Sequence, residues 1–206
     1  MKNAKTWVGL LLFGSLWGVV EVVVGEALFA RDVPYASVWL TAWGFLMLAL
    51  ARGAVNSPGS SAAVGSVASL YKLAFAAPYF CHLLGIFFLG MTFDIFATLL
   101  LKDKRVQAWK RGLAGALSAY SGYALFALVI TYIARYGPWV AGGWPKVANH
   151  IFVGGGLAAL VCLAVVPAGY WLGEKGWAAV AGHPRWAFAG ALALTIAVWT
   201  LGGLTG

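Results

Sequence analysis

Apolar runs about 20 residues long recur along the whole chain, and no other feature of the sequence limits its fold as strongly. An α-helix needs roughly 20 apolar residues to cross the hydrocarbon core of a bilayer. The composition agrees, because 62% of the residues are hydrophobic and 10% are charged, whereas a soluble domain has about 45–50% and about 25%. The sequence therefore predicts an integral membrane protein with almost no soluble part.

The positions of the helices follow from hydropathy and from interruptions by Pro, Gly and charged residues. We expect a single integral membrane domain over residues 1–206, an all-α polytopic membrane helix bundle of six to seven transmembrane helices. No linker, internal repeat or soluble domain is visible in the sequence. The expected helices span about 7–29, 35–51, 61–78, 82–101, 112–134, 147–172 and 186–203.

The basic residues between these helices are unevenly distributed, which indicates the orientation of the chain. With the loop around 102–111 placed in the cytoplasm, ten basic residues fall on the cytoplasmic side and three on the outer side. We therefore expect a multi-pass protein of the cell (plasma) membrane with a cytoplasmic N-terminus. This bias and anionic headgroups account for the net charge of +8 without a nucleic-acid partner. The ten are Lys2, Lys5, Arg52, Lys102, Lys104, Arg105, Lys110, Arg111, Lys175 and Arg185, and the three are Arg31, Arg135 and Lys146.

Four charged residues, Glu21, Glu26, Lys72 and Asp94, fall inside the expected helices. Such a residue at the bilayer centre costs about 2.5–3.5 kcal/mol on insertion scales, so it usually has a partner. At a rise of about 1.5 Å per residue, Glu21 and Lys72 lie at similar depth. We expect them to form a buried ion pair that either fixes helix packing or contacts a polar substrate. Glu26 falls near the outer interface, and Asp94 is expected to accept a hydrogen bond from a hydroxyl such as that of Thr92 or from another helix.

Small residues shape two of the expected helices. Gly14 and Gly18 form a small-x-x-x-small pattern, which lets another helix approach closely. The pattern predicts either packing within this bundle or docking to another membrane subunit. Gly154 to Gly156 are three consecutive glycines, which indicate close helix approach or room for a ligand.

Polar and aromatic residues gather in the segments assigned to the outer side. Many of the Trp and Tyr residues are expected to form an ordinary aromatic belt. The segment 135–146 contains Pro, Gly and two Trp residues, and we expect a loop that covers the outer mouth as a lid or plug. His82, Asn149 and His150 begin two helices at similar depth and could converge on a pocket open to the outside.

No pattern in the sequence demands a metal ion, a cofactor or catalysis. The chain has no His-x-x-x-His or Cys-x-x-Cys pattern, no catalytic Ser/His/Asp set and no phosphate-binding loop. We therefore expect no metal, no cofactor and no enzymatic activity. Three alternatives stay open. They are a membrane redox or metal-binding protein that uses His82 and His150, an accessory subunit of a larger membrane complex, and a small membrane enzyme with Glu21 or Asp94 as acid or base.

Three stretches give the chain a resemblance to a known family. They are the stripe from Gly14 to Gly18, the Gly-rich segment "SPGSSAAVGSVASLYKL" at 57–73, and "LGIFFLGMTFDIFATLLL" at 84–101. Over roughly residues 7–172 the chain resembles the substrate-binding S-components of energy-coupling factor (ECF) vitamin transporters. These are small, Gly-rich, very hydrophobic proteins with six helices, so the expected helix at 186–203 departs from the family.

The resemblance implies a substrate-capturing subunit of an ATP-driven importer for a small, heterocyclic, vitamin-like molecule. It implies partners as well, a separate membrane scaffold subunit and ATPase subunits, with Gly14 and Gly18 as the docking stripe. The substrate pocket would lie near the outer face at the ends of the fourth to sixth helices. The matching positions are His82, Trp139, Trp144, Asn149 and His150, with Glu26 and Lys72 nearby.

Overall fold

The computed structural model describes residues 2–74, 80–102 and 106–205, which form helices joined by short turns. No β-strand occurs among the described residues. In chain order the elements are α1 (Lys2–Ala30), α2 (Ala36–Ala54), α3 (Ser60–Leu70) with the 3₁₀ turn η1 (Tyr71–Ala74), α4 (Phe80–Leu100), α5 (Ala108–Leu128) with the π-helical η2 (Val129–Ile133), α6 (Gly137–Ala148), the π-helical η3 (Asn149–Gly154), α7 (Gly155–Gly182) and α8 (Pro184–Thr205).

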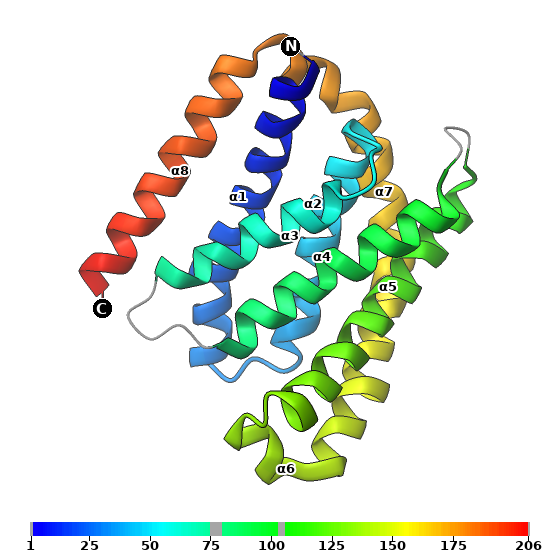
Figure 1. Ribbon diagram of the computed structural model, residues 1–206, viewed down its shortest axis with the longest axis vertical. Coiled ribbons are helices and arrows are strands. Elements are labelled where there is room, and N and C mark those ends of the chain that lie inside the picture. The colour runs from blue at the N-terminus through cyan, green and yellow to red at the C-terminus, as the bar shows by residue number, and fades with distance from the viewer. Residues whose placement is uncertain (1, 75–79, 103–105, 206) are drawn as a thin grey trace.

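The helices run back and forth between two ends of the molecule (Figure 1). One end, named here the N-side, carries the start of α1, the turn at 55–59 and the junction of α7 with α8. The other end, named the α6 side, carries the turn at 31–35, the start of α4 and helix α6. Helix α8 lies on one flank, where it packs mainly on α1 and η1.

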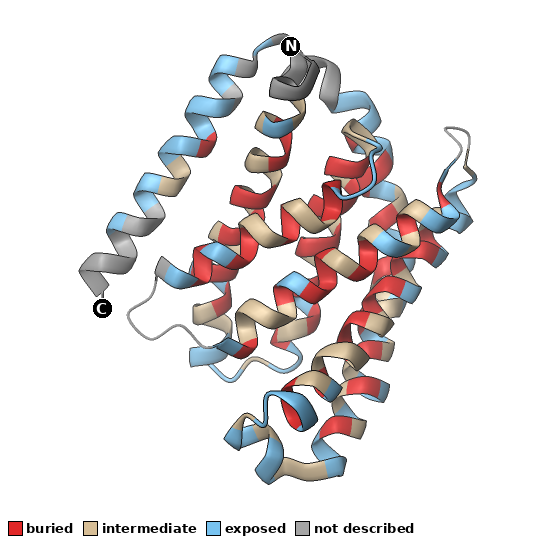
Figure 2. Ribbon diagram, in the orientation of Figure 1, coloured by how far each residue is buried: buried red, intermediate tan, exposed pale blue. Residues whose placement is uncertain are grey.

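Five helices of the described chain are long and apolar enough to cross a membrane, namely Thr6–Ala30, Ala36–Ala54, Phe80–Leu100, Ala108–Ile133 and Gly137–Gly176. Their outward faces expose large apolar side chains, whereas the faces turned toward neighbouring helices are buried (Figure 2). Leu117 on α5, Leu160 on α7 and Ile95 on α4 are examples of such exposed side chains. Soluble proteins rarely expose apolar surface on this scale. The fold is therefore an all-α membrane helix bundle, as predicted, although five helices of the described chain have spanning length where six to seven were expected.

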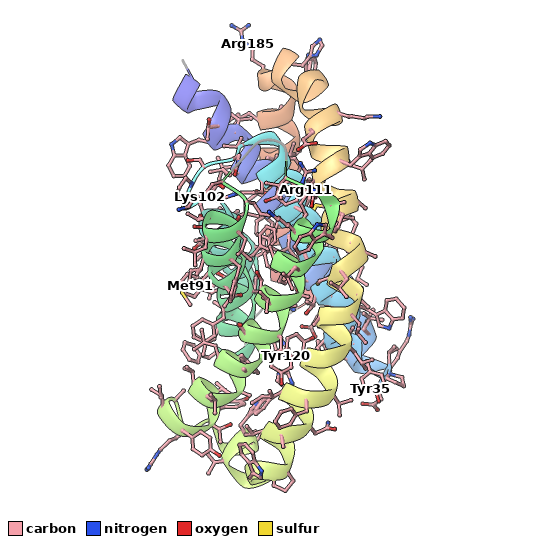
Figure 3. All side chains as sticks on the ribbon, turned by 90° about the vertical axis from the view of Figure 1, so that its right-hand side faces the viewer. Tyr35, Met91, Lys102, Arg111, Tyr120 and Arg185 are labelled. Carbon is pink, nitrogen blue, oxygen red and sulfur yellow. The ribbon has the colours of Figure 1, made fainter. Side chains whose placement is uncertain are left out.

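Charged and aromatic side chains mark the two ends of the bundle. Lys102, Arg111 and Arg185 lie toward the N-side, and Tyr35 lies toward the α6 side (Figure 3). Exposed tryptophans occur on helices near both ends, including Trp39 in the first turn of α2 and Trp109 in the first turn of α5. Two aromatic bands separated by an apolar zone match the two interfaces of a bilayer.

Glycines bring several helices into backbone contact. A Cβ atom placed on Gly90 of α4 would lie only 2.8 Å from the Cα atom of Gly65 in α3. A Cβ atom on Gly169 of α7 would lie 2.7 Å from the Cβ atom of Ala49 in α2. Both distances are shorter than side-chain carbons allow, so only glycine permits these crossings. The pairs α3–α4 and α2–α7 are thereby held close together.

A buried polar network joins α2, α3 and α4 on the N-side. The Arg52 side chain is 2% exposed, and its Nη1 donates to Asp94 Oδ1 at 3.0 Å. Its Nη2 donates to the hydroxyl of Thr98 at 2.7 Å. Asp94 also accepts hydrogen bonds from the backbone N–H groups of Gly59 and Ser61, at 2.8 and 2.9 Å. The carboxylate therefore caps the N-terminus of α3, which is the structural role expected for Asp94.

The third expected helix, 61–78, is shorter in the structure. Helix α3 ends at Leu70 and the chain tightens into η1, which ends at Ala74. Residues 75–78 of the expected helix lie outside the described residues. Because Lys72 falls in η1, the tighter winding of this turn determines where its side chain points.

The segment expected as a lid loop, 135–146, is largely helical. Helix α6 begins at Gly137, with Pro138 in the first turn, where its missing N–H group costs nothing. Gly143, with φ of 56°, interrupts the helix and bends it. The chain then continues through η3 into α7, which extends to Gly182 instead of ending near 172. Sequence reasoning treated Pro and Gly as loop residues, but here they start and bend a helix.

Candidate functional site

A cavity of about 270 Å³ lies in the α6-side half of the bundle, between α1, α2, α4, α5, α6 and η3. It extends from the first turns of α2 and α4, at Ser37 and His82, to Glu21 in α1. Glu21 precedes the end of α1 at Ala30 by nine residues, which corresponds to about 14 Å along the helix. The cavity therefore reaches well into the membrane-spanning part of the bundle.

One wall of this cavity is an aromatic cluster formed by Tyr123, Phe126, Trp139 and His150. The rings of Tyr123 and His150 are stacked, with centroids 4.6 Å apart. Trp139 meets His150 edge to face at 5.0 Å and meets Phe126 in the same way at 5.0 Å. These rings come from α5, α6 and η3, so the bent helix α6 supplies a wall of the cavity. Such mutual packing holds the rings in place.

The glycines at the start of α7 make room for this wall. A Cβ atom on Gly154 or Gly155 would lie 3.1 Å from the Tyr123 side chain. The glycines therefore let Tyr123 lie flat against the helix that carries His150. No atom lies within 4 Å of the corresponding position on Gly156.

A further part of the lining comes from α1 and the first turn of α4. The ring of Phe29 stacks on His82, with centroids 5.2 Å apart. Cys81, a free cysteine that is 8% exposed, also lines the cavity here. Both histidines of the cavity are thus stacked against an aromatic ring.

Polar groups occupy a few positions inside this aromatic lining. The Glu21 side chain is 6% exposed, and its Oε1 accepts a hydrogen bond from Trp17 Nε1 at 3.0 Å. The hydroxyls of Thr41 and Tyr123 share a hydrogen bond of 3.1 Å. An apolar pocket with a small number of fixed polar groups is the usual form of a small-molecule site.

Lys72 lies beside the cavity and contacts both glutamates of α1. Its Nζ donates to the backbone carbonyl of Glu21 at 2.6 Å and lies 3.5 Å from Glu26 Oε1. The Lys72 side chain is 3% exposed and that of Glu26 is 43% exposed. The expected contact between Glu21 and Lys72 thus involves the main chain of Glu21, whereas its carboxylate is bonded to Trp17.

The structure brings part of the predicted binding set together. His82, Trp139 and His150 line the same cavity, and Glu21 lines it with them. Trp144 and Asn149 are exposed and do not line it, and Glu26 is half-exposed beside Lys72.

Sequence reasoning missed Thr41, Phe126 and Tyr123 as lining residues. All three lie in ordinary apolar helix sequence. For the two residues of α5, Tyr123 and Phe126, the sequence contains one weak signal. Hydroxyl and ring side chains recur at Tyr120, Tyr123 and Phe126, a helical spacing that places them on one face of α5.

Gly14 and Gly18 pack inside the bundle. A Cβ atom on Gly14 would lie 2.6 Å from Val67 of α3, and one on Gly18 would lie 2.6 Å from the ring of Tyr71. Of the two alternatives for this stripe, packing within the chain accounts for both glycines.

A second cavity, of about 540 Å³, lies at the N-side. Arg52, Arg111, Tyr170 and Glu174 line it. Arg111 Nη2 lies 2.6 Å from Glu174 Oε1, and its guanidinium lies over the Tyr170 ring at 4.9 Å. Both arginines of this second cavity are thus already paired with carboxylates of this chain. The second cavity also lacks the cluster of aromatic rings that lines the first among the described residues.

Among the described residues, no group of three or more His, Cys, Asp or Glu side chains is placed to hold a metal ion. Comparison of the chain with protein-family models, with curated proteins and with solved structures finds no match.

Proposed function

We propose that this protein captures a small, flat, heterocyclic molecule in the aromatic cavity at the α6 side. The observation that supports the proposal is the lining of this cavity by Phe29, His82, Phe126, Trp139 and His150, with Glu21 and Thr41 as fixed polar groups. Aromatic faces pack against flat rings, and the polar groups can select their substituents.

The size of the cavity supports a small ligand. Sites for small molecules commonly have volumes of about 300–1,000 Å³, and this cavity, at about 270 Å³, lies just below that range. A ligand of one or two rings matches this space.

The protein would lie in the plasma membrane, with its N-terminus in the cytoplasm. Lys102, Lys110 and Lys175 belong to the N-side, and the basic residues assigned to the α6 side are fewer. By the positive-inside rule the α6 side then faces outward. The cavity would take its ligand from outside the cell.

The resemblance to ECF S-components extends this proposal to transport. The protein would act as the substrate-capturing subunit of an ATP-driven vitamin importer, together with a membrane scaffold and ATPases. The chain itself contains no phosphate-binding loop, so the ATPases would be separate chains. Because Gly14 and Gly18 pack against α3 and η1, the scaffold would use another surface.

Native mass spectrometry of the protein, purified alone in mild detergent, tests capture. We expect a bound organic species of a few hundred daltons. A variant that fills the cavity, Gly85→Leu, should lose the bound species. Gly85 lines the cavity, and a Cβ atom at this position would already lie 3.6 Å from the Phe126 ring, so a longer side chain would occupy the ligand space. Gly156→Leu is the matched control, since its position is open, and it should keep the bound species.

The outcomes separate the candidate functions. A wild-type protein without any bound organic mass, or an equal bound mass in Gly85→Leu, would contradict capture in this cavity. A haem or metal mass would favour the alternative that uses His82 and His150. Co-purification of one scaffold subunit and ATPases from native membranes would support the importer, and purification without partners would contradict that part.

A further inference from the structure

The carboxylate of Glu21 is the acidic group inside the proposed binding cavity. It lines the cavity, it is 6% exposed, and it accepts a hydrogen bond from the neutral indole of Trp17. A carboxylate in an apolar setting is costly unless it meets a cation, and a neutral donor does not supply that charge.

The cation near Glu21 is divided between two groups. Among the described residues, Lys72 donates to the main-chain carbonyl of Glu21 and forms a salt bridge with Glu26, so its ammonium group is not dedicated to the Glu21 carboxylate. Lys72 forms its salt bridge with Glu26 at 3.5 Å. Lys146, an exposed cation near the cavity, donates to the Pro138 carbonyl at 3.0 Å and lies over the Trp139 ring at 5.0 Å.

Aromatic rings from three helices also line the cavity. They are Phe29 of α1, Phe126 of α5 and Trp139 of α6. The face of an aromatic ring attracts a cation, most strongly where water is excluded, and aromatic cages bind quaternary ammonium groups in this way.

We propose that the molecule held in this cavity is an aromatic cation, an amine, quaternary ammonium or protonated heterocycle, with Glu21 as its counter-charge and the aromatic walls around its ring. This inference rests on the proposed function and names its ligand class. Glu21 is assigned here as a binding residue, whereas Lys72 is shared between the Glu21 main chain and Glu26.

Cys81 offers a direct reporter of occupancy. The sequence contains two cysteines, and Cys162 is fully buried outside the cavity. In a Cys162→Ala background, the small neutral reagent methyl methanethiosulfonate should modify Cys81, and a ligand in the cavity should slow this modification. The probes are phenyltrimethylammonium, its neutral isostere tert-butylbenzene, and the anion benzenesulfonate.

We expect phenyltrimethylammonium to protect Cys81 better than either other probe. Glu21→Gln keeps an oxygen for the Trp17 hydrogen bond, and it should raise the half-protecting concentration of phenyltrimethylammonium on the order of tenfold. Protection by tert-butylbenzene should not change. Asp32→Asn removes the same charge from an exposed position at the end of α1, and it should leave all three probes unaffected. Native mass spectrometry of bound phenyltrimethylammonium gives a second readout that does not depend on the reactivity of Cys81.

Equal protection by the cation and its isostere, stronger protection by benzenesulfonate, or an unchanged cation affinity in Glu21→Gln would overturn the inference. In those cases the cavity still binds aromatic molecules and the proposed capture function stands. If no probe protects Cys81 and none is found bound by mass, the cation assignment fails, and the native mass spectrum of the untreated protein decides capture separately. If Glu21→Gln does not fold, the ranking of the three probes on the unsubstituted Glu21 decides the inference.

Discussion

At the scale of single residues, Arg52 and Asp94 show how this bundle tolerates charge. Arg52 is 2% exposed and Asp94 is 14% exposed, and the two groups are 3.0 Å apart. The Asp94 carboxylate also accepts hydrogen bonds from the backbone N–H groups of Gly59 and Ser61, at the start of α3. Because each charge is both paired and hydrogen-bonded, the cost of burying it is offset.

This arrangement makes a prediction for a double-mutant cycle. Arg52→Met or Asp94→Asn alone should lower the free energy of unfolding by about 3–5 kcal/mol, because each leaves a buried charge without its partner. The double variant should lose less than the sum of the two single changes. Denaturation of the purified protein in detergent measures all four forms.

A second ion pair provides the control for this cycle. Arg111 and Glu174 are also close, at 2.6 Å, but Glu174 is 45% exposed. Their coupling should be about 0.2–1 kcal/mol, as for surface pairs. Equal coupling energies in the two cycles would show that burial does not set the strength of the Arg52–Asp94 pair.

At the scale of helices, the close crossings depend on glycine. Helices α3 and α4 touch at Gly65 and Gly90, and α2 and α7 touch at Gly169. Lipid offers no hydrophobic driving force between helices, so close van der Waals contact has to hold them together. The α3–α4 crossing also fixes the position of α4, which carries Cys81 and His82 at its start.

Replacement of Gly90 by alanine tests this dependence. The new methyl group would lie 2.8 Å from the Cα atom of Gly65, with only backbone to move aside. We expect a loss of about 1–3 kcal/mol in stability, which is typical of overpacking. Gly156→Ala, at an open helical position, should be neutral or slightly stabilising. Thermal denaturation in detergent compares them, and similar stabilities of the two variants would argue against a tight crossing.

At the scale of the whole molecule, the arrangement of the helices separates two chemically different ends. The N-side holds the ion-paired cavity lined by Arg52, Arg111 and Glu174, and the α6 side holds the aromatic cavity. The proposed function requires the α6 side to face outward, and this requirement can be examined without knowledge of the ligand.

Cysteine labelling in intact cells measures this orientation. In a chain with Cys81 and Cys162 replaced by alanine, Asp32→Cys lies in the exposed turn on the α6 side and Pro58→Cys in the exposed turn on the N-side. We expect a membrane-impermeant maleimide to label Asp32→Cys in intact cells and Pro58→Cys only after permeabilisation. The reverse pattern would place the aromatic cavity on the cytoplasmic side and rule out capture from outside.

The membrane-bundle character of this protein and most of its helices could be predicted from the sequence. Hydropathy is a local property, so runs of apolar residues indicated the spans without knowledge of their partners. Depth could also be predicted from the helical rise, which is why His82 and His150 were expected at one level and line one cavity. The local reading failed at 135–146, because Pro138 and Gly143 permit a bent helix as readily as a loop.

The tertiary structure alone decided which side chains meet at each depth. Glu21 and Lys72 were placed at one level, but the rotation of α1 and the turn η1 direct the Lys72 ammonium to the Glu21 carbonyl and to Glu26. Tyr123 became a wall of the cavity because Gly154 and Gly155 let it lie flat beneath His150. Helix rotation and helix separation depend on contacts between residues far apart in the chain, and a one-dimensional pattern does not contain them.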